Sequence, residues 1–267
     1  MKQIEISHLW KHYGQKPVLE NLSLSINKGE FVSIVGASGC GKTTFFRLLL
    51  GEEQATRGRM LLEGKPWPQE PDADRGVVFQ RYSVFPHMTA LANVRAALDF
   101  AGAPLTGRLF GSAKKAANDE AMAMLEAVGL AGARDKFPHE LSGGMQQRLA
   151  LAQSLVRHPG ILLLDEPFGA LDPGIRADMH ELMQSLWQEH GFTVFMVTHD
   201  IREGFLLGTR MLVFDRVRID PQAPDAYGAQ ITYDLALKSK TRADFAELQE
   251  SVQTKAPLTS AAEETLP

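Results

Sequence analysis

The residues best suited to chemistry form a glycine-rich segment near the start of the chain. Residues 36–43 read GASGCGKT, which fits the phosphate-binding pattern G-x-x-x-x-G-K-[ST]. Glycines allow successive backbone N–H groups to turn toward phosphate oxygens, and the helix expected after them adds its positive dipole end. Lys42 can reach the β- and γ-phosphates, and the hydroxyl of Thr43 can ligate Mg²⁺. The segment predicts a nucleotide site rather than a chance glycine turn. The residues expected to contact the nucleotide here are Gly36, Ala37, Ser38, Gly39, Cys40, Gly41, Lys42, Thr43 and Thr44.

Two adjacent carboxylates follow an apolar run later in the chain. Asp165 and Glu166 come directly after Ile161–Leu164, which is typical of a strand buried in a parallel sheet. Such a strand delivers its last residues to the same edge of the sheet as a phosphate-binding loop. We predict that Asp165 helps to hold Mg²⁺ and that Glu166 is the general base for the attacking water. In isolation the pair could equally cap the next helix.

Apolar patterns predict an α/β core that positions these groups. Alternation at Ile4–Leu9 and Leu22–Ile26 indicates half-buried strands, and the continuous run Phe31–Val35 indicates a strand buried on both faces. A helix is expected over Thr43–Leu50, ended by Gly51. Further strands are expected at Met60–Leu62, Gly76–Phe79, Ile161–Leu164, Thr193–Val197, Met211–Phe214 and Gln230–Leu235.

Two helical regions complete the predicted core. The segment from about Ser83 to Val156 is rich in Ala, Leu, Met, Glu and Lys and has almost no strand signal, so we expect a helical insertion. An amphipathic helix is expected over Arg176–Glu189, with its apolar residues on one face. Those apolar residues are Met179, Leu182, Met183 and Leu186.

Composition excludes several broad classes of protein. With 267 residues, 44% hydrophobic and 22% charged, the chain is of globular composition, which excludes a disordered or fibrous protein. Its 28 Lys and Arg against 32 Asp and Glu give a net charge of −4, so no basic surface indicates a nucleic-acid partner. The single cysteine, Cys40, suits a reducing compartment. No apolar run approaches the about 20 residues that cross a bilayer, and the first residues do not read as a signal peptide.

A second anion-binding turn is predicted at Leu141–Arg148, which reads LSGGMQQR. Ser142 can cap the following helix, and Gly143 and Gly144 expose backbone N–H groups at its positive end. Taken alone, Ser-Gly-Gly is a common turn. Together with the phosphate-binding loop, the segment resembles the signature of the ATP-binding cassette (ABC) ATPases. The resemblance implies a head-to-tail dimer in which each signature closes over the γ-phosphate held by the other subunit.

Four further residues fall where the family places functional groups. Tyr13 resembles the aromatic residue that stacks on adenine, and Gln80 resembles the glutamine that senses Mg²⁺ and water. Asp172 resembles the aspartate that acts across the dimer, and His199 resembles the histidine that contacts the γ-phosphate. Each has a structural alternative: a packing tyrosine, a polar strand end, a turn before a helix, or a structural histidine. Their order, from residue 3 to about residue 214, supports the resemblance.

The resemblance implies an ATPase with ATP and Mg²⁺ as cofactors. Its expected catalytic residues are Glu166, His199, Gln80 and Lys42, and its expected metal ligands are Thr43, Gln80 and Asp165. The fold class implied is α/β: a P-loop NTPase core with a mixed, mainly parallel sheet flanked by helices, an N-terminal antiparallel β subdomain and a helical insertion subdomain. We expect one ABC ATPase domain over residues 1–240, with the helical subdomain at about 83–156. Residues 241–267 form a C-terminal extension that is expected to be disordered from about residue 254.

The resemblance also implies a role in membrane transport. The segment Gln80–Thr89, followed by Asn93, is similar to bacterial importer ATPases, most of all to the nitrate/sulfonate/taurine group. It implies a peripheral subunit on the cytoplasmic face of the inner membrane, with separate permease subunits docking near Gln80–His87. Tyr82 and Phe85 are the expected exposed aromatic contacts, although both could pack inside the helical subdomain. A paired ATPase subunit, in a homodimer or with another chain, and an external solute-binding protein complete the expected complex, without nucleic acid.

Other functions stay open from the sequence. A soluble ABC ATPase of translation or DNA repair is the main alternative, but the single cassette and the lack of sustained heptads between Gln80 and Leu141 disfavour it. An ABC exporter ATPase is another, and a metabolic kinase would not need the signature. Residues 216–237 depart from the shorter hairpin of the nitrate/taurine group, so a urea-like solute is an alternative substrate.

Overall fold

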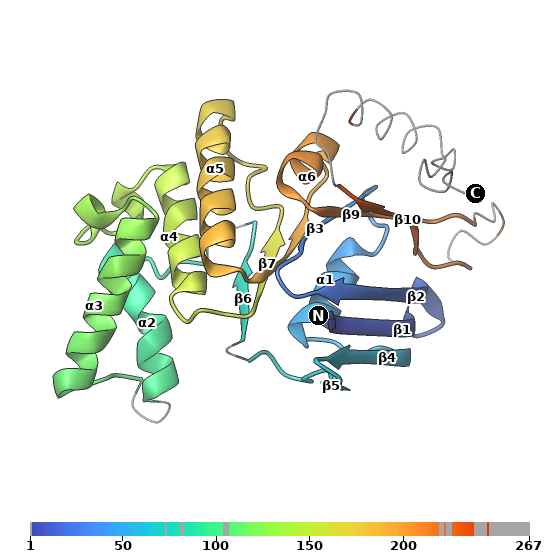
Figure 1. Ribbon diagram of the computed structural model, residues 1–267, viewed down its shortest axis with the longest axis horizontal. Helices are drawn as coiled ribbons and strands as arrows, with labels where there is room; N and C mark the ends of the chain where they lie inside the picture. Colours follow the sequence, from blue (N-terminus) through green and yellow to red (C-terminus); the bar gives the residue numbers. More distant parts are fainter. Residues whose placement is uncertain are drawn as a thin grey trace, which may run out of the picture.

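The computed structural model describes residues 2–72, 74–80, 83–103, 107–218, 222, 226–237 and 245. These residues form a central sheet, an antiparallel sheet and a group of helices at one end of the molecule (Figure 1). The arrangement confirms the predicted fold class, with a mixed, mostly parallel sheet, an N-terminal antiparallel sheet and a helical insertion. The predicted extension from residue 241 lies outside the described residues except for Phe245.

The central sheet has six strands in the order β10-β9-β3-β8-β7-β6. All neighbours are parallel except β10 and β9, which are antiparallel. Successive residues of the parallel strands point to opposite faces, and most of them are apolar because both faces are covered, as the continuous runs predicted. The buried polar residues Ser33, Arg75 and Thr193 are exceptions. The strands are β3 (Phe31–Gly36), β6 (Arg75–Val78), β7 (Ile161–Asp165), β8 (Thr193–Val197), β9 (Arg210–Asp215) and β10 (Gln230–Ala236).

The antiparallel sheet is built from the strands with alternating patterns, in the order β2-β1-β4-β5. On β1 the apolar residues Ile4, Ile6 and Leu9 are buried, which confirms the predicted half-buried strand. The buried face packs on one side of a helix whose other side packs on the central sheet. The strands are β1 (Lys2–Tyr13), β2 (Lys16–Asn27), β4 (Arg57–Leu62) and β5 (Lys65–Pro66), and the shared helix is α1 (Lys42–Leu50).

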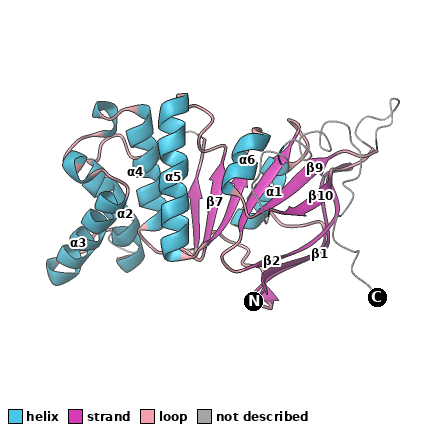
Figure 2. Ribbon diagram, turned by 45° about the horizontal axis from the view of Figure 1, so that its top comes forward, coloured by secondary structure: helices cyan, strands magenta, loops and turns pink. Residues whose placement is uncertain are grey.

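Helices α4, α5 and α6 pack on the other face of the central sheet, and α2 and α3 pack on α4. Figures 1 and 2 show α5 between the sheet and the helical group that contains α2, α3 and α4. The predicted insertion is confirmed as helical, while the short α6 escaped prediction because seven residues with a glycine among them carry no period. The helices are α2 (Ala90–Gly102), α3 (Gly111–Ala127), α4 (Gly143–Leu155), α5 (Pro173–His190) and α6 (Ile201–Leu207), with 3₁₀ turns at Ala131–Ala133 and Pro138–Glu140.

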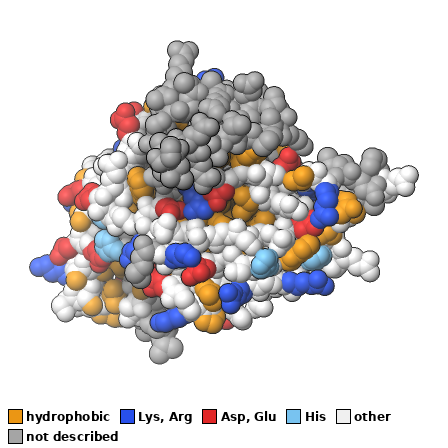
Figure 3. Space-filling model, turned by 45° about the vertical axis from the view of Figure 1, so that its right-hand side comes forward, with side chains coloured by type: hydrophobic (Ala, Val, Ile, Leu, Met, Phe, Trp, Pro, Cys, Tyr) orange, Lys and Arg blue, Asp and Glu red, His pale blue; other side chains and the backbone are white. Residues whose placement is uncertain are grey.

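The surface carries charges of both signs. On the face drawn in Figure 3, Lys and Arg side chains lie among Asp and Glu side chains rather than in one field. A continuous positive field is what draws proteins to nucleic acid, and this face does not have one. Within the described part of the chain, no helix combines the length and the apolarity needed to cross a membrane.

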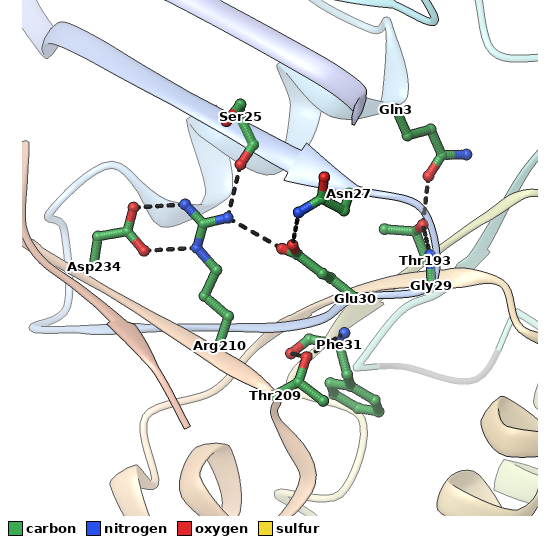
Figure 4. Close-up of polar contacts among 10 residues, drawn as sticks. All are labelled: Gln3, Ser25, Asn27, Gly29, Glu30, Phe31, Thr193, Thr209, Arg210 and Asp234. Atoms are coloured by element: carbon green, nitrogen blue, oxygen red, sulfur yellow. Dashed lines mark hydrogen bonds and ion pairs between the residues drawn. The ribbon is translucent and has the colours of Figure 1, made fainter. Parts of the chain in front are cut away.

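A cluster around Arg210 joins the two sheets (Figure 4). The guanidinium of Arg210 on β9 donates two hydrogen bonds of 2.6 Å to the Asp234 carboxylate on β10. Its Nη1 also donates to the backbone oxygen of Ser25 on β2 at 2.7 Å and to Glu30 at 3.1 Å. Hydrogen bonding to Asp234 and Glu30 raises the pKa of Arg210 above its usual value, so the positive charge is retained. Arg210 thereby fixes one edge of the central sheet to the antiparallel sheet.

Replacing this arginine is expected to weaken the fold. In Arg210→Met, the half-buried Glu30 carboxylate and the Ser25 backbone oxygen lose a hydrogen-bond donor, while water can replace the partner of the exposed Asp234. The free energy of unfolding should therefore fall by about 1–2 kcal/mol. Urea denaturation measures the change. The control is Arg59→Met on the exposed surface of β4, which should change stability by less than about 0.5 kcal/mol. Equal stability of the two variants would contradict the assigned role of Arg210.

Candidate active site

Four neighbouring strands of the central sheet end at the candidate site. β3, β8, β7 and β6 are adjacent and parallel, so their carboxyl ends lie at the same edge of the sheet. The glycine-rich loop follows β3, and His199 follows β8. Asp165 ends β7, Glu166 comes directly after it, and Gln80 follows β6. Residues separated by more than a hundred positions in the sequence therefore meet at one edge.

The glycine-rich loop fits a space that admits no larger side chain at two positions. A Cβ atom on Gly36, which has φ 155°, would lie 2.3 Å from the backbone oxygen of Phe214 and 2.8 Å from Sγ of Cys40. Gly41 has φ 87° and begins α1, and a Cβ atom there would lie 2.7 Å from Cδ2 of Leu19 on β2. The loop is thus held between β9 and β2, which explains why these two positions are glycine.

The side chain of Lys42 is folded back onto its own loop. Nζ donates to the backbone oxygens of Gly36 at 2.6 Å and Ala37 at 2.9 Å. Only 8% of the residue is exposed, so the charge is carried inside the loop. Next to it, burial raises the pKa of the Cys40 thiol, an effect that the charge of Lys42 partly offsets. A thiol held protonated is a poor nucleophile, so Cys40 acts as a small buried residue.

The segment after β7 is held in a strained conformation. Glu166 has φ 46°, in the left-handed region that non-glycine residues seldom adopt, and its N–H donates to the backbone oxygen of Val197 on β8 at 2.9 Å. Burial and the charge of Glu166 raise the pKa of Asp165, against the opposing charge of Lys42. Asp165 is therefore electrostatically linked to the lysine of the loop.

Two side chains converge on one carboxylate oxygen of Glu166. Nε2 of Gln80 donates to Oε2 of Glu166 at 3.2 Å, and Nδ1 of His199 lies 3.4 Å from the same oxygen. The His199 side chain is 65% exposed and that of Glu166 is 28% exposed, so the cluster faces solvent. The arrangement holds a carboxylate between an amide and an imidazole, which is suited to orienting a water molecule and to stabilising negative charge.

The predicted signature turn lies away from this cluster. Ser142 caps α4 by accepting a hydrogen bond from the Met145 N–H at 3.3 Å, as predicted. Gly144 packs against α5, where a Cβ atom would lie 2.5 Å from Cγ2 of Ile175. Ser142 and Gly143 are exposed. In the described residues no hydrogen bond or ion pair joins this turn to the loop after β3.

Two other predicted residues, Tyr13 and Asp172, lie outside the cluster of Gln80, Glu166 and His199. Tyr13, at the end of β1, is 45% exposed, and its hydroxyl donates to the carboxylate of Glu53 at 2.5 Å. The ammonium group of Lys11 lies 5.1 Å from the centroid of the Tyr13 ring. Asp172 precedes α5 and is exposed, without a side-chain hydrogen bond to the helix.

Thr43 is exposed at the start of α1, whereas Thr44 is buried.

One group of polar residues beside the site was not predicted. Glu203 on α6 is buried and accepts hydrogen bonds from Thr198, and it also contacts His180 on α5. The sequence does contain a signal for the start of α6, because Asp200 followed three positions later by Glu203 is a helix-start pattern. Asp200 does cap α6, accepting from the N–H groups of Arg202 at 2.8 Å and Glu203 at 3.3 Å.

Residues 19–169 match the protein family described as ABC transporter. Among named relatives, the aliphatic sulfonates import ATP-binding protein SsuB of Yersinia pestis is 42% identical over 81% of this chain and 74% of its own length. The corresponding SsuB 1 protein of Burkholderia cenocepacia is 40% identical over 83% of this chain. The chain spans only 64% of the length of that Burkholderia protein.

Solved structures show the same architecture. The dimeric structure of MJ0796, a bacterial ABC transporter cassette, is 30% identical and has a TM-score of 0.69 over 88% of this chain and 99% of its own. A second dimeric structure of that cassette, in a post-hydrolysis state bound to ADP and phosphate, is 29% identical with a TM-score of 0.68, at the same coverage. CbiO1 of Clostridium perfringens, at 23% identity and a TM-score of 0.75 over 95% of this chain and 96% of its own, shares the fold.

The position of Lys42 leads to a prediction about nucleotide binding. Lys42→Ala should weaken ATP binding by about 10- to 100-fold, because a charge-assisted hydrogen bond to phosphate would be lost. Isothermal titration calorimetry measures the affinity. Lys65→Ala, on exposed strand β5, removes a lysine distant in sequence from the loop and should leave the affinity unchanged. If Lys42→Ala bound ATP as tightly as the unmodified chain, the loop would not be the nucleotide site.

Proposed function

The chain belongs to the ABC transporter family, and we propose that it is the ATP-hydrolysing subunit of an importer for a small solute. The observation that carries the proposal is the contact of Glu166 with both Gln80 and His199 at the sheet edge where the phosphate-binding loop begins. A carboxylate held in this way can direct water toward a bound phosphate. Hydrolysis would supply the energy, and the solute would pass through other subunits.

Phosphate binding is assigned to the loop after β3 and the first turn of α1. Backbone N–H groups of residues 36–43 and the positive end of α1 favour an anion. Lys42, held by the Gly36 and Ala37 carbonyls in the structure, would exchange these contacts for the β- and γ-phosphates. Tyr13 is assigned to the adenine, since nearly half of the residue is exposed and its ring can stack on a base.

The residues around the loop fit a magnesium ion. Thr43, Asp165 and Gln80 supply oxygen atoms, the ligands that Mg²⁺ prefers, and a single carboxylate is enough when phosphates supply further oxygens. Within the described residues no group of three or more His, Cys, Asp or Glu forms a metal site of its own, which agrees with a metal that arrives with the nucleotide. The ion would neutralise negative charge on the phosphates.

Glu166 is the proposed general base. It would accept a proton from the water that attacks the γ-phosphate, while Gln80 keeps its carboxylate in place. His199, within 3.4 Å of the same carboxylate, would donate a hydrogen bond to the phosphate and stabilise the charge that develops there. This chemistry is mainly positioning and electrostatic stabilisation, which is how phosphoryl transfer is generally catalysed.

We assign the signature turn and Asp172 to a partner subunit's nucleotide. Ser142, Gly143 and Asp172 are exposed, and the signature turn has no hydrogen bond to the chain's own loop in the described residues. The related MJ0796 cassettes are dimers in their solved structures. A head-to-tail dimer would bring the N–H groups at the start of α4 to the γ-phosphate held by the other subunit.

Sulfonates or similarly small anions are the proposed substrate class. The relatives are named as import proteins for aliphatic sulfonates, and the predicted nitrate/sulfonate/taurine group includes such solutes. The substrate would be chosen by the permease and by an external solute-binding protein. We propose that this chain is bound peripherally at the cytoplasmic face of the inner membrane, as an importer subunit.

The permease is proposed to dock near residues 80–87. Phe85 is half-buried rather than exposed, while Tyr82 lies outside the described residues. The buried Asn93 fixes this turn: its side chain accepts from the Phe85 N–H at 2.7 Å and donates to the Phe85 backbone oxygen at 3.1 Å. The proposed docking segment begins with Gln80, the residue that contacts Glu166.

The non-transport alternatives receive less support. In the described part of the insertion the helices are 13, 17 and 13 residues long, too short for the long coiled coil of a DNA-repair ATPase. The relatives are named as import proteins, which also favours import over export.

The general-base assignment is tested by Glu166→Gln. The amide keeps the shape of the side chain but cannot accept the proton, so kcat for ATP hydrolysis should fall by about 10²–10⁴-fold while ATP still binds. Phosphate release measures turnover, and calorimetry measures binding. Glu189→Gln, on an exposed position of α5, is the control and should hydrolyse ATP normally. Near-normal turnover in Glu166→Gln would refute the assignment.

The docking assignment is tested by Tyr82→Ala combined with Phe85→Ala. Loss of two aromatic contacts should abolish co-purification of the permease from detergent-solubilised membranes, identified by mass spectrometry. A thermal melt shows whether the variant is folded. Phe110→Ala, which removes a 71% exposed aromatic residue at the start of α3, is the control and should retain the permease. A folded double variant that still co-purified would place the docking surface elsewhere.

A further inference from the structure

A stripe of polar side chains on α5 faces α6 and the segment before it. The stripe consists of Arg176, His180 and Gln184, spaced by four residues so that they lie on one face of the helix. The apolar residues Met179, Met183 and Leu186 of the same helix are buried in the core on another face. The contacts are Arg176 Nη1 to Asp200 Oδ2 at 3.9 Å, His180 Nε2 to Glu203 Oε1 at 3.0 Å, and Gln184 Nε2 to the Leu206 backbone oxygen at 3.0 Å.

Glu203, the partner of the half-buried His180, is itself buried, and its contacts extend to both sides of His199. Glu203 is 5% exposed, and its second carboxylate oxygen accepts from the Thr198 hydroxyl at 2.6 Å. The Thr198 oxygen in turn accepts from the Asp200 N–H at 3.1 Å. An ionised carboxylate only accepts hydrogen bonds, so Nε2 of His180 carries the hydrogen in its contact with Glu203. The residues directly before and after His199 are therefore both bound into one network.

The helix α6 that carries Glu203 has little freedom to move. Gly204 lies so close to β3 that a Cβ atom on it would be 3.3 Å from Cβ of Ser33. The Ser33 hydroxyl donates to the Gly204 backbone oxygen at 2.9 Å. Because α6 is fixed on the central sheet, the Glu203 carboxylate is a fixed point to which the segment around His199 can be held.

The same face of α5 also contacts residues 168–172, the segment that leads into the helix and ends at Asp172. The ring of Phe168, two positions after Glu166, meets His180 edge-on with centroids 5.0 Å apart. Arg176 donates through Nη2 to the Leu171 backbone oxygen at 3.2 Å, and its N–H donates to the Asp172 backbone oxygen at 2.8 Å. This face of α5 therefore contacts both the segment that carries Asp172 and the segment that carries His199.

The direct contact between His199 and Glu166 cannot hold His199 in place by itself. Their side chains are 65% and 28% exposed, and an ion pair open to water contributes little because water screens it. Buried hydrogen bonds to a carboxylate contribute more, because their loss leaves a desolvated charge without a partner. The network around Glu203 is the stronger constraint on the His199 segment.

We propose that His180 and Glu203 are positioning residues for hydrolysis, which hold His199 opposite Glu166 and link it through α5 to Asp172. The proposal rests on the proposed function, because it assigns these residues a part in ATP hydrolysis. They act on the reaction through the backbone of residues 198–200 and do not touch the nucleotide. Movement of Asp172 at a dimer contact would be passed to His199 by the α5 face that carries Arg176 and His180.

Three substitutions on the α5 face test the proposal. His180→Leu removes the hydrogen bond to Glu203, while His180→Gln can still donate one through its amide. Gln184→Leu is the matched control, because it removes a hydrogen bond between the same two helices one turn farther along. His180→Leu should lower kcat for ATP by about tenfold or more with little change in KM, whereas His180→Gln and Gln184→Leu should stay within about threefold of the unmodified chain.

Hydrogen exchange gives a readout that does not depend on activity. The Asp200 N–H is bonded to the Thr198 hydroxyl, so its exchange reports on the segment around His199 directly. His180→Leu should speed exchange in the peptide spanning residues 198–200, and Gln184→Leu should not.

The experiments distinguish failure of the proposed function from failure of the positioning role of His180 and Glu203. An unmodified chain that does not hydrolyse ATP would refute the proposed function, while the exchange measurement would still decide whether His180 orders the segment around His199. Unchanged kcat and unchanged exchange in His180→Leu would overturn the positioning role. Equal loss of kcat in His180→Leu and Gln184→Leu, matched by equal loss of thermal stability, would also overturn it, because His180 would then be only a structural contact.

Discussion

The parallel pairing of β6, β7, β8 and β3 is the constraint on which the candidate site depends. Each strand ends at the same edge of the sheet, and each delivers one element of the site there. The pairing is itself secured by burial, because the strands are apolar on both faces and have helices on each side. Loss of register by one residue would turn Asp165 to the opposite face of the sheet. The chemistry of the site is therefore a consequence of how the core is packed.

The layers on the two faces of the central sheet have different roles. On one side, α1 lies between the central and antiparallel sheets, and the Arg210 cluster fixes the two sheets together. This holds the phosphate-binding loop, in which Gly36 and Gly41 lie too close to neighbouring atoms for any side chain. On the other side, α5 touches the segments around Asp172 and around His199. The first side gives the site rigidity, and the second side offers a route by which a partner could influence it.

Glu166, whose backbone is strained, lies between these two sides of the central sheet. A non-glycine residue at φ 46° persists only when its surroundings fix it, and here the hydrogen bond from its N–H to the Val197 backbone oxygen does so. Gln80, which contacts Glu166, stands at the start of the helical insertion, whose first turn is fixed by Asn93. The proposed base is thus joined both to the insertion and to α5.

The sequence by itself determined the motifs and most of the elements. Local patterns suffice for this, because the glycine-rich loop, the apolar strands and the capped start of α4 at Ser142 are each specified by neighbouring residues. Only the tertiary structure decided that Glu166 contacts Gln80 and His199, that Phe85 is half-buried, and that Glu203 meets His180. These contacts join residues far apart in the chain, and whether they form depends on strand order and on how α5 and α6 pack. A local pattern holds no information about such packing, so the polar network of α6 emerged only from the fold, although Asp200 and Glu203 mark in the sequence where that helix begins.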